Sequence, residues 1–176
     1  MSDVLEFMLF TGCRIGEVMA LRWTHVDIGK SSVTFAASVS RATGAGLLLQ
    51  EHGKTASSTR TISVPSEVTD LLKRRQTSTM SELVFPSMLG KLRDTSNTEA
   101  HWRANRDRLG YPGMTTHAFR KTVATALDVS GLSGRATAEY LGHKQPSMTQ
   151  DVYMSRNTGS EEAARKLGAM FGVTSE

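Results

Sequence analysis

Tyr153 and three short upstream segments carry the residues of this sequence that are best suited to chemistry. The segments are residues 11–17 (TGCRIGE), 117–120 (HAFR) and 141–143 (LGH). They contribute the cationic or titratable side chains Arg14, His117, Arg120 and His143. Two arginines, two histidines and a tyrosine form a coherent set only when the fold gathers them around one anionic group. We predict that this group is a DNA phosphate.

The two arginines suit a phosphate that changes its charge during a reaction. His117 and Arg120 are three residues apart, so on a helix they share a face and can reach one bound phosphate. Arg14 comes from a distant segment and would clamp the other non-bridging oxygen through planar, bidentate hydrogen bonds. Two such clamps would neutralise the charge of a pentacoordinate transition state, the task of metal ions in many other phosphoryl-transfer enzymes. Taken alone, either arginine would more often form a surface salt bridge.

The remaining groups complete a possible reaction centre. A phenol has an ordinary pKa of about 10, so Tyr153 needs a neighbour that accepts its proton, and His117 is the best general-base candidate. Glu17, one turn after Arg14, is expected to orient that arginine rather than to perform chemistry. His143 would donate a hydrogen bond to the phosphate or steady the leaving group. The alternatives are a half-buried packing role for the tyrosine and a helix-capping role for His143.

In their order and their flanking residues, these segments resemble the catalytic domain of the tyrosine recombinases, the phage integrase family. Each segment alone is a weak signal, whereas the ordered set, with a tyrosine ten residues after His143, is specific. The resemblance extends from about Val4 to the C-terminal end. It implies that Tyr153 becomes covalently joined to a 3′ phosphate and releases a 5′ hydroxyl. It also implies that Lys54 protonates the departing 5′ oxygen, although a lysine in a polar loop is usually only solvated.

The resemblance therefore implies a site-specific DNA recombinase, or integrase, that serves integration or excision of a phage or mobile element. Strands would be cleaved and rejoined through a phosphotyrosine intermediate on double-stranded DNA attachment sites. Two alternatives stay open: a type IB topoisomerase, which rejoins the same strand, and a non-catalytic DNA-binding protein of the same fold, which would have no use for the tyrosine. No cofactor is expected, and the sequence contains no metal-binding pattern.

Composition agrees with this interpretation. The 176 residues suit one domain, and a net charge of +4 with a pI near 9.5 permits a polyanionic partner. Cys13 is the only cysteine, so an internal disulfide is impossible and a reducing cytoplasm is the expected location. No stretch approaches the roughly 20 apolar residues of a membrane span, so no membrane association is expected.

Periodicity and turn residues predict a mixed α/β (α+β) fold, mostly helical, with a small three-stranded antiparallel sheet. A helix at residues 3–10 should end at Gly12, and a second should start beside Arg14. The strands are expected at residues 33–40, 47–50 and 60–64, with Lys54 on the loop 52–58. Further helices are expected at 66–75, at 97–109 with a basic face, and at 117–129. A later helix should end at 141–142, another should open at Pro146 and hold Tyr153, and the last is expected at 160–171.

The resemblance also sets expectations about domains and partners. Integrases generally place a core-binding domain, and often an arm-binding domain, before the catalytic one, and Val4 already belongs to the helix that precedes Arg14. We therefore expect residues 1–176 to be a single catalytic domain without those N-terminal domains, binding DNA weakly through phosphates. Residues 160–176 would either pack on a neighbouring protomer in a tetramer on DNA or fold back onto their own core. The free fragment is expected to be a monomer.

Overall fold

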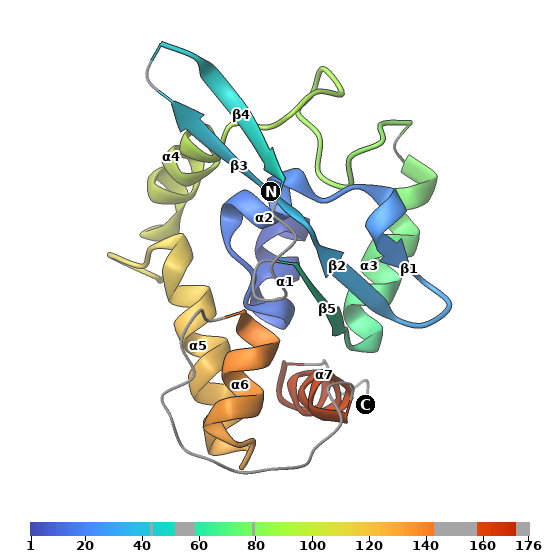
Figure 1. Ribbon diagram of the computed structural model, residues 1–176. Coiled ribbons are helices and arrows are strands. Elements are labelled where there is room, and N and C mark those ends of the chain that lie inside the picture. The colour runs from blue at the N-terminus through green and yellow to red at the C-terminus, as the bar shows by residue number, and fades with distance from the viewer. Residues whose placement is uncertain (43, 52–58, 79, 143–157, 172–176) are drawn as a thin grey trace.

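The computed structural model describes residues 1–42, 44–51, 59–78, 80–142 and 158–171, and the side chains of 158–160 are not among the described atoms. Lys54, His143, Tyr153 and the helix predicted to open at Pro146 lie outside the described residues. Within them, the predicted α+β class is confirmed: helices dominate and the strands form small antiparallel sheets (Figure 1).

The helices occur where capping residues and apolar periodicity predict them. They are α1 (Ser2–Thr11), α2 (Ile15–Ala20), α3 (Ser66–Ser78), α4 (Thr95–Arg106), α5 (Thr116–Val129), α6 (Gly134–Leu141) and α7 (Thr158–Phe171), with a 3₁₀ turn at Trp23–His25. The largest shift concerns α4, which was expected at 97–109. Asp94 caps it by accepting a hydrogen bond from the Ser96 amide at 2.9 Å, so the helix starts two residues earlier.

The strands pair differently from the prediction. The strands belong to two sheets. The first contains β1 (Val26–Asp27), which was not predicted, with β2 (Ser32–Phe35) and β5 (Arg60–Ser63), and the second is a hairpin of β3 (Ala37–Ala42) and β4 (Gly46–Glu51). The region 33–40 is thus two strands, and β5 pairs with β2, placing Val33 opposite Ile62, rather than with β4. Alternation along the sequence marks strands but does not select their partners, because pairing is decided by long-range packing.

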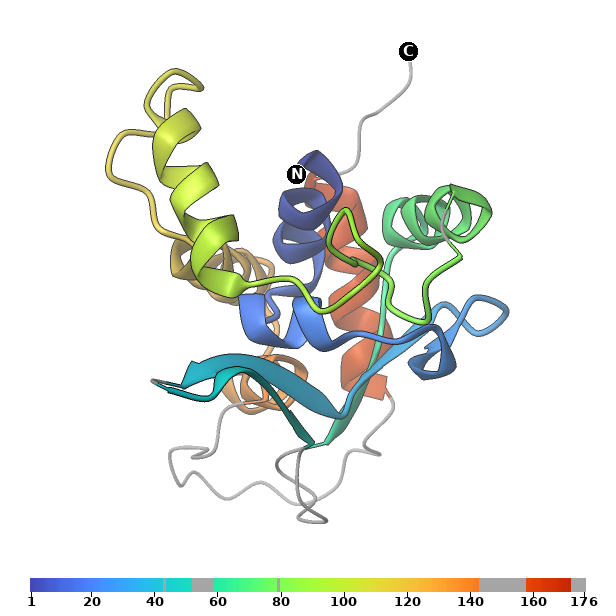
Figure 2. The same cartoon turned by 90° about the horizontal axis from the view of Figure 1, so that it is seen from above.

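Helix α1 lies at the centre of the molecule and contacts α3, α5 and α7. Its Phe7 packs edge-on against Phe85 and Phe35, with ring centroids 5.2 and 6.4 Å away, and all three rings are almost fully buried. Figure 2 shows the two sheets along one side of the molecule, at the lower part of the view, with α1, α3 and α7 above them. The core therefore fixes the position of α1, and α2 follows it after a turn of three residues.

Helix α7 packs against its own chain. Its Ala163 and Leu167 are fully buried, and it contacts α1, α5, α6 and β5. The ring of Phe171 meets Phe10 edge-on at 5.9 Å. Of the two packings expected for the last helix, the single chain thus adopts the one on its own core. Across the described ranges, no helix is long and apolar enough to cross a membrane.

Candidate active site

The turn between α1 and α2 is the point where α5 and α6 pack against the end of α1. Gly12 ends α1 with a left-handed φ of 61°, and its amide donates to the Met8 carbonyl. A Cβ atom at this position would lie 2.5 Å from Leu141 of α6 and 3.1 Å from Val123 of α5. Only glycine fits both the backbone angle and this close approach. Helices α5 and α6 are therefore seated directly on the turn that precedes Arg14.

Arg14 and Glu17 form the start of α2. Arg14 occupies the N-cap position, and its side chain is 49% exposed, whereas Glu17 is buried. One carboxylate oxygen of Glu17, Oε2, accepts from the Arg14 backbone amide at 2.8 Å, and the other, Oε1, accepts from Arg14 Nη1 at 3.2 Å. The carboxylate thus caps the helix and restrains the Arg14 guanidinium at the same time.

A third arginine, Arg60, belongs to the same cluster and was not among the predicted site residues. Its side chain is 11% exposed, and its Nη1 and Nη2 donate to the two oxygens of Glu17 at 2.8 and 3.0 Å. A signal for it was present in the sequence, because Arg60 alternates with Ile62 along a strand. An arginine on the same strand face as a core isoleucine must find a buried partner.

The charge of Glu17 is secured by these arginines. Burial raises the pKa of the carboxyl group, but hydrogen bonds and charge from Arg60, followed by those from Arg14, outweigh it and bring the pKa to about 2. Glu17 is therefore a carboxylate at neutral pH. Its role of orienting Arg14 stays a proposal that these contacts support.

Arg120 connects all three segments singled out in the sequence. It lies on α5 and is 3% exposed, its Nη1 donates to the Gly12 carbonyl at 2.9 Å, and its Nη2 donates to the Leu141 carbonyl at 2.5 Å. Burial first, and then the nearby charges of Arg14 and Arg60, lower the pKa of its guanidinium to about 10. Arg14 and Arg120 are thus close enough in the fold to repel one another.

The cluster has an excess of positive charge. Among the described side chains, the ion pairs of Arg14 and Arg60 both go to Glu17, and Arg120 donates to backbone carbonyls. Three guanidinium groups around one carboxylate leave two positive charges in excess. Such a cluster suits an anion, and the half-exposed Arg14 is the member that solvent reaches.

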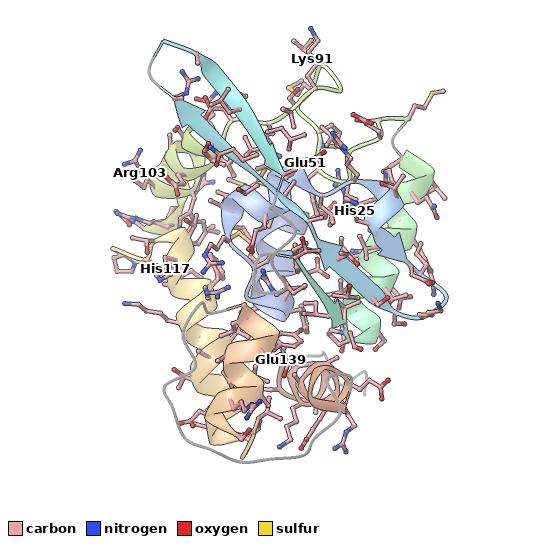
Figure 3. All side chains as sticks on the ribbon, in the orientation of Figure 1. His25, Glu51, Lys91, Arg103, His117 and Glu139 are labelled. Carbon is pink, nitrogen blue, oxygen red and sulfur yellow. The ribbon has the colours of Figure 1, made fainter. Side chains whose placement is uncertain are left out.

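His117 precedes Arg120 by one turn on α5 and is exposed. Figure 3 shows it at the N-terminal end of α5, on the same edge of the view as Arg103 of α4. No described contact joins His117 to the arginine cluster. The structure therefore gathers Arg14, Glu17 and Arg120 and places His117 one turn before Arg120 on α5. It does not describe Lys54, His143 or Tyr153.

Two other potential nucleophiles are held in the interior. Burial raises the pKa of Cys13 to about 12, so its thiol stays protonated. Burial likewise raises the pKa of Tyr140, whose hydroxyl donates to the carbonyls of Phe10 and Ser63 at 3.3 and 3.4 Å. Of the three tyrosines, this leaves Tyr153 and the exposed Tyr111, which packs near Trp102.

Comparison with known proteins gives a consistent result. The model of the phage integrase family matches residues 2–159. A tyrosine recombinase XerC-like protein of Caldanaerobacter subterraneus subsp. tengcongensis is 28% identical over 169 residues, covering 81% of this chain and 42% of that protein. The integrase of Staphylococcus phage L54a is 25% identical, covering 86% of this chain and 47% of its own length. The chain thus spans about half the length of these relatives.

Solved structures show the same fold. The integrase of transposon Tn1549, solved in complex with transposon right end DNA, superposes with a TM-score of 0.76 at 20% identity, covering 97% of this chain and 58% of that one. XerA recombinase gives a TM-score of 0.62 at 23% identity, covering 99% of this chain and 60% of that one.

Proposed function

Because the chain belongs to the phage integrase family, we propose that it carries the catalytic centre of a site-specific DNA recombinase. The observation that carries this proposal is the cluster of Arg14, Arg60 and Arg120 around the single carboxylate of Glu17. Its surplus of two positive charges suits a phosphodiester, which carries one negative charge in the ground state and more in a pentacoordinate transition state. The complex of the Tn1549 integrase with DNA supports duplex DNA as the partner.

In the proposed cleavage step, the phenolic oxygen of Tyr153 attacks the scissile phosphorus while His117 accepts the phenolic proton. The bond between phosphorus and the 5′ oxygen breaks, and Lys54 supplies a proton to that leaving oxygen. Arg14 and Arg120 hold the non-bridging oxygens, and His143 donates a hydrogen bond to the same phosphate. The product is a 3′-phosphotyrosine link and a free 5′ hydroxyl.

Rejoining is the reverse reaction with a different alcohol. A 5′ hydroxyl from a second duplex attacks the phosphotyrosine and gives its proton to Lys54, while the phenolate leaves and recovers its proton from His117. The phosphodiester count is unchanged, so the exchange needs no external energy source. The proposed assembly is a tetramer on two DNA sites. One of the structures similar to this chain is a lambda integrase tetramer bound to a Holliday junction, with a TM-score of 0.52.

The most direct test is trapping of the covalent intermediate. The chain is incubated with a nicked suicide duplex, whose cleaved end is lost, and denaturing gels are used to detect a protein–DNA adduct. We expect an adduct with the original chain and none with Tyr153→Phe. The matched control is Tyr111→Phe, which removes the hydroxyl of an exposed tyrosine outside the proposed site and should leave the adduct yield unchanged.

The other outcomes select the alternatives. Absence of any Tyr153-dependent adduct would indicate a non-catalytic DNA-binding protein. An adduct accompanied by relaxation of supercoiled DNA, but without exchange between two duplexes, would indicate a type IB topoisomerase activity.

A further inference from the structure

All three guanidinium nitrogens of Arg60 donate hydrogen bonds inside the protein. Nη1 and Nη2 donate to the two carboxylate oxygens of Glu17 on α2, and Nε donates to the Tyr140 carbonyl at 3.2 Å, in the last turn of α6. Its Cζ lies 4.6 Å from the centroid of the Phe35 ring on β2. One side chain of β5 therefore connects α2, α6 and β2, and a planar fork with three donor atoms is needed to make these contacts together.

The first connection reaches Arg14. Each oxygen of Glu17 is shared: Oε1 accepts from Arg60 at 2.8 Å and from the Arg14 guanidinium at 3.2 Å, and Oε2 accepts from Arg60 at 3.0 Å and from the Arg14 amide at 2.8 Å. The fork of Arg60 thus sets the plane of the carboxylate, and that carboxylate restrains Arg14. Because the Arg14 side chain is 49% exposed, it would otherwise sample many rotamers.

The second connection reaches the end of α6. Arg60 binds the Tyr140 carbonyl, and Arg120 binds the next carbonyl, that of Leu141. Gly142 then leaves the helix with a left-handed φ of 70°, and a Cβ atom there would lie 2.8 Å from Cδ and Nη1 of Arg60. The chain continues directly into His143. Arg60 therefore helps to fix the point from which the segment with two proposed active-site residues departs.

We propose that Arg60 is a positioning residue of the strand-cleavage reaction, which holds Arg14 through Glu17 and holds the C-terminal end of α6 through the Tyr140 carbonyl. It acts without touching the DNA phosphate, because Nε, Nη1 and Nη2 of Arg60 all donate to protein acceptors, whereas the described hydrogen bonds of Arg120 use only Nη1 and Nη2. This inference rests on the proposed recombinase function, and it deepens that function by adding a residue to the cleavage machinery.

The test uses Arg60→Lys, because lysine keeps the positive charge beside Glu17 but cannot make the planar fork. We expect single-turnover cleavage of the suicide duplex at saturating DNA to slow about tenfold to a hundredfold, since small misplacements of catalytic groups have effects of that size. The dissociation constant for DNA should change less than about threefold, since Arg60 makes no phosphate contact.

Arg75→Lys is a closely matched control. Like Arg60, Arg75 makes three kinds of contact. Its Nε donates to the Val84 carbonyl at 2.8 Å, and its Nη1 pairs with the Asp3 carboxylate at 2.6 Å. Its Cζ lies 4.7 Å from the centroid of the Phe85 ring. It belongs to α3, which has no residue in the guanidinium cluster. This variant should lose a similar amount of thermal stability and cleave at the original rate.

A double-mutant cycle tests the route through Glu17. If Arg60 acts on Arg14 through this carboxylate, Arg60→Lys combined with Glu17→Gln should cleave no more slowly than the slower single variant. Independent, multiplying losses would contradict that route. Equal stability losses in Arg60→Lys and Arg75→Lys, with the original cleavage rate in both, would mean that Arg60 is only structural.

A second measurement does not depend on cleavage. Phenylglyoxal modifies accessible guanidinium groups, and mass spectrometry gives its rate at Arg14. We expect that rate to rise several-fold in Arg60→Lys and to stay constant in Arg75→Lys. If the original chain forms no DNA adduct, the recombinase proposal fails, yet this rate still decides whether Arg60 positions Arg14; an unchanged rate would overturn the positioning role itself.

Discussion

At the scale of single residues, the candidate site is organised by one carboxylate. Glu17 accepts four hydrogen bonds, two from Arg14 and two from Arg60, and is almost completely buried. A buried ion of this kind is strongly destabilising when one partner is removed, because the remaining charge has no substitute for water. Arg14, Glu17 and Arg120 are recognisable from the sequence, but the second partner of the carboxylate, Arg60, is not.

Glu17→Gln should lower the free energy of unfolding by about 3 kcal/mol at neutral pH, because Arg60 is left without its charged partner. Urea unfolding followed by tryptophan fluorescence measures this difference. The loss of unfolding free energy caused by Glu17→Gln should be smaller at acidic pH. The pKa of Glu17 falls from an ordinary 4.5 to about 2 on folding, so its ionised form contributes stability above about pH 4.5 and loses it as the pH falls to 2.

The gap in unfolding free energy between the original chain and Glu17→Gln should therefore narrow between pH 5 and pH 2. All other carboxylates are common to both proteins, so the difference isolates Glu17. A gap that stays constant over this range would show that the carboxylate is not held in its charged form by the arginines.

At the scale of elements, the turn between α1 and α2 determines how the helices bearing the site meet. Gly12 provides the helix end, the close contact with α5 and α6, and the carbonyl to which Arg120 donates. A local signal for the end of a helix thus coincides with a tertiary contact.

Gly12→Ala should destabilise the protein by about 3 kcal/mol, since it combines left-handed backbone strain with overlap against Leu141. Gly110→Ala is the control: its φ is also positive, at 86°, but no atom lies within 4 Å of the added Cβ, so only about 1 kcal/mol is expected. Urea unfolding of both variants provides the comparison. Equal losses of unfolding free energy in the two variants would mean that the side chains around Gly12 rearrange to accept the Cβ atom without further destabilisation.

At the scale of the whole molecule, α7 closes the core. It covers parts of α1, α5, α6 and β5, and its Ala163 and Leu167 are inaccessible to solvent. Removing it would return these apolar surfaces to water, at a cost of roughly 25 cal/mol for each Å² exposed. Packing of the same helix on a neighbouring protomer was the alternative expectation, and in the single chain the helix packs on its own core.

Deletion of residues 160–176 should abolish cooperative thermal unfolding or lower its midpoint by more than about 10 °C, as expected for the loss of several kcal/mol from a domain of this size. Circular dichroism measures the transition, and deletion of residues 172–176 alone is the control, with little change expected. A truncated chain that keeps its midpoint but no longer self-associates would instead indicate that the helix belongs on a neighbouring protomer.

The features that could be predicted from the sequence are those that depend on residues close together along the chain. Helix ends at Gly12 and Gly142, the start of α2 at Arg14 and the α+β class follow from short-range patterns of capping and periodicity. The resemblance to the phage integrase family followed from ordered motifs and is confirmed by the family match over residues 2–159.

Only the tertiary structure decided which distant groups meet. Strand β2 pairs with β5 across the hairpin β3–β4, and Arg60 binds a carboxylate 43 residues away in the sequence. The packing of α7 on its own core is of the same kind. Such partners are selected by burial and charge pairing among segments that are remote along the chain, and no local pattern encodes that choice.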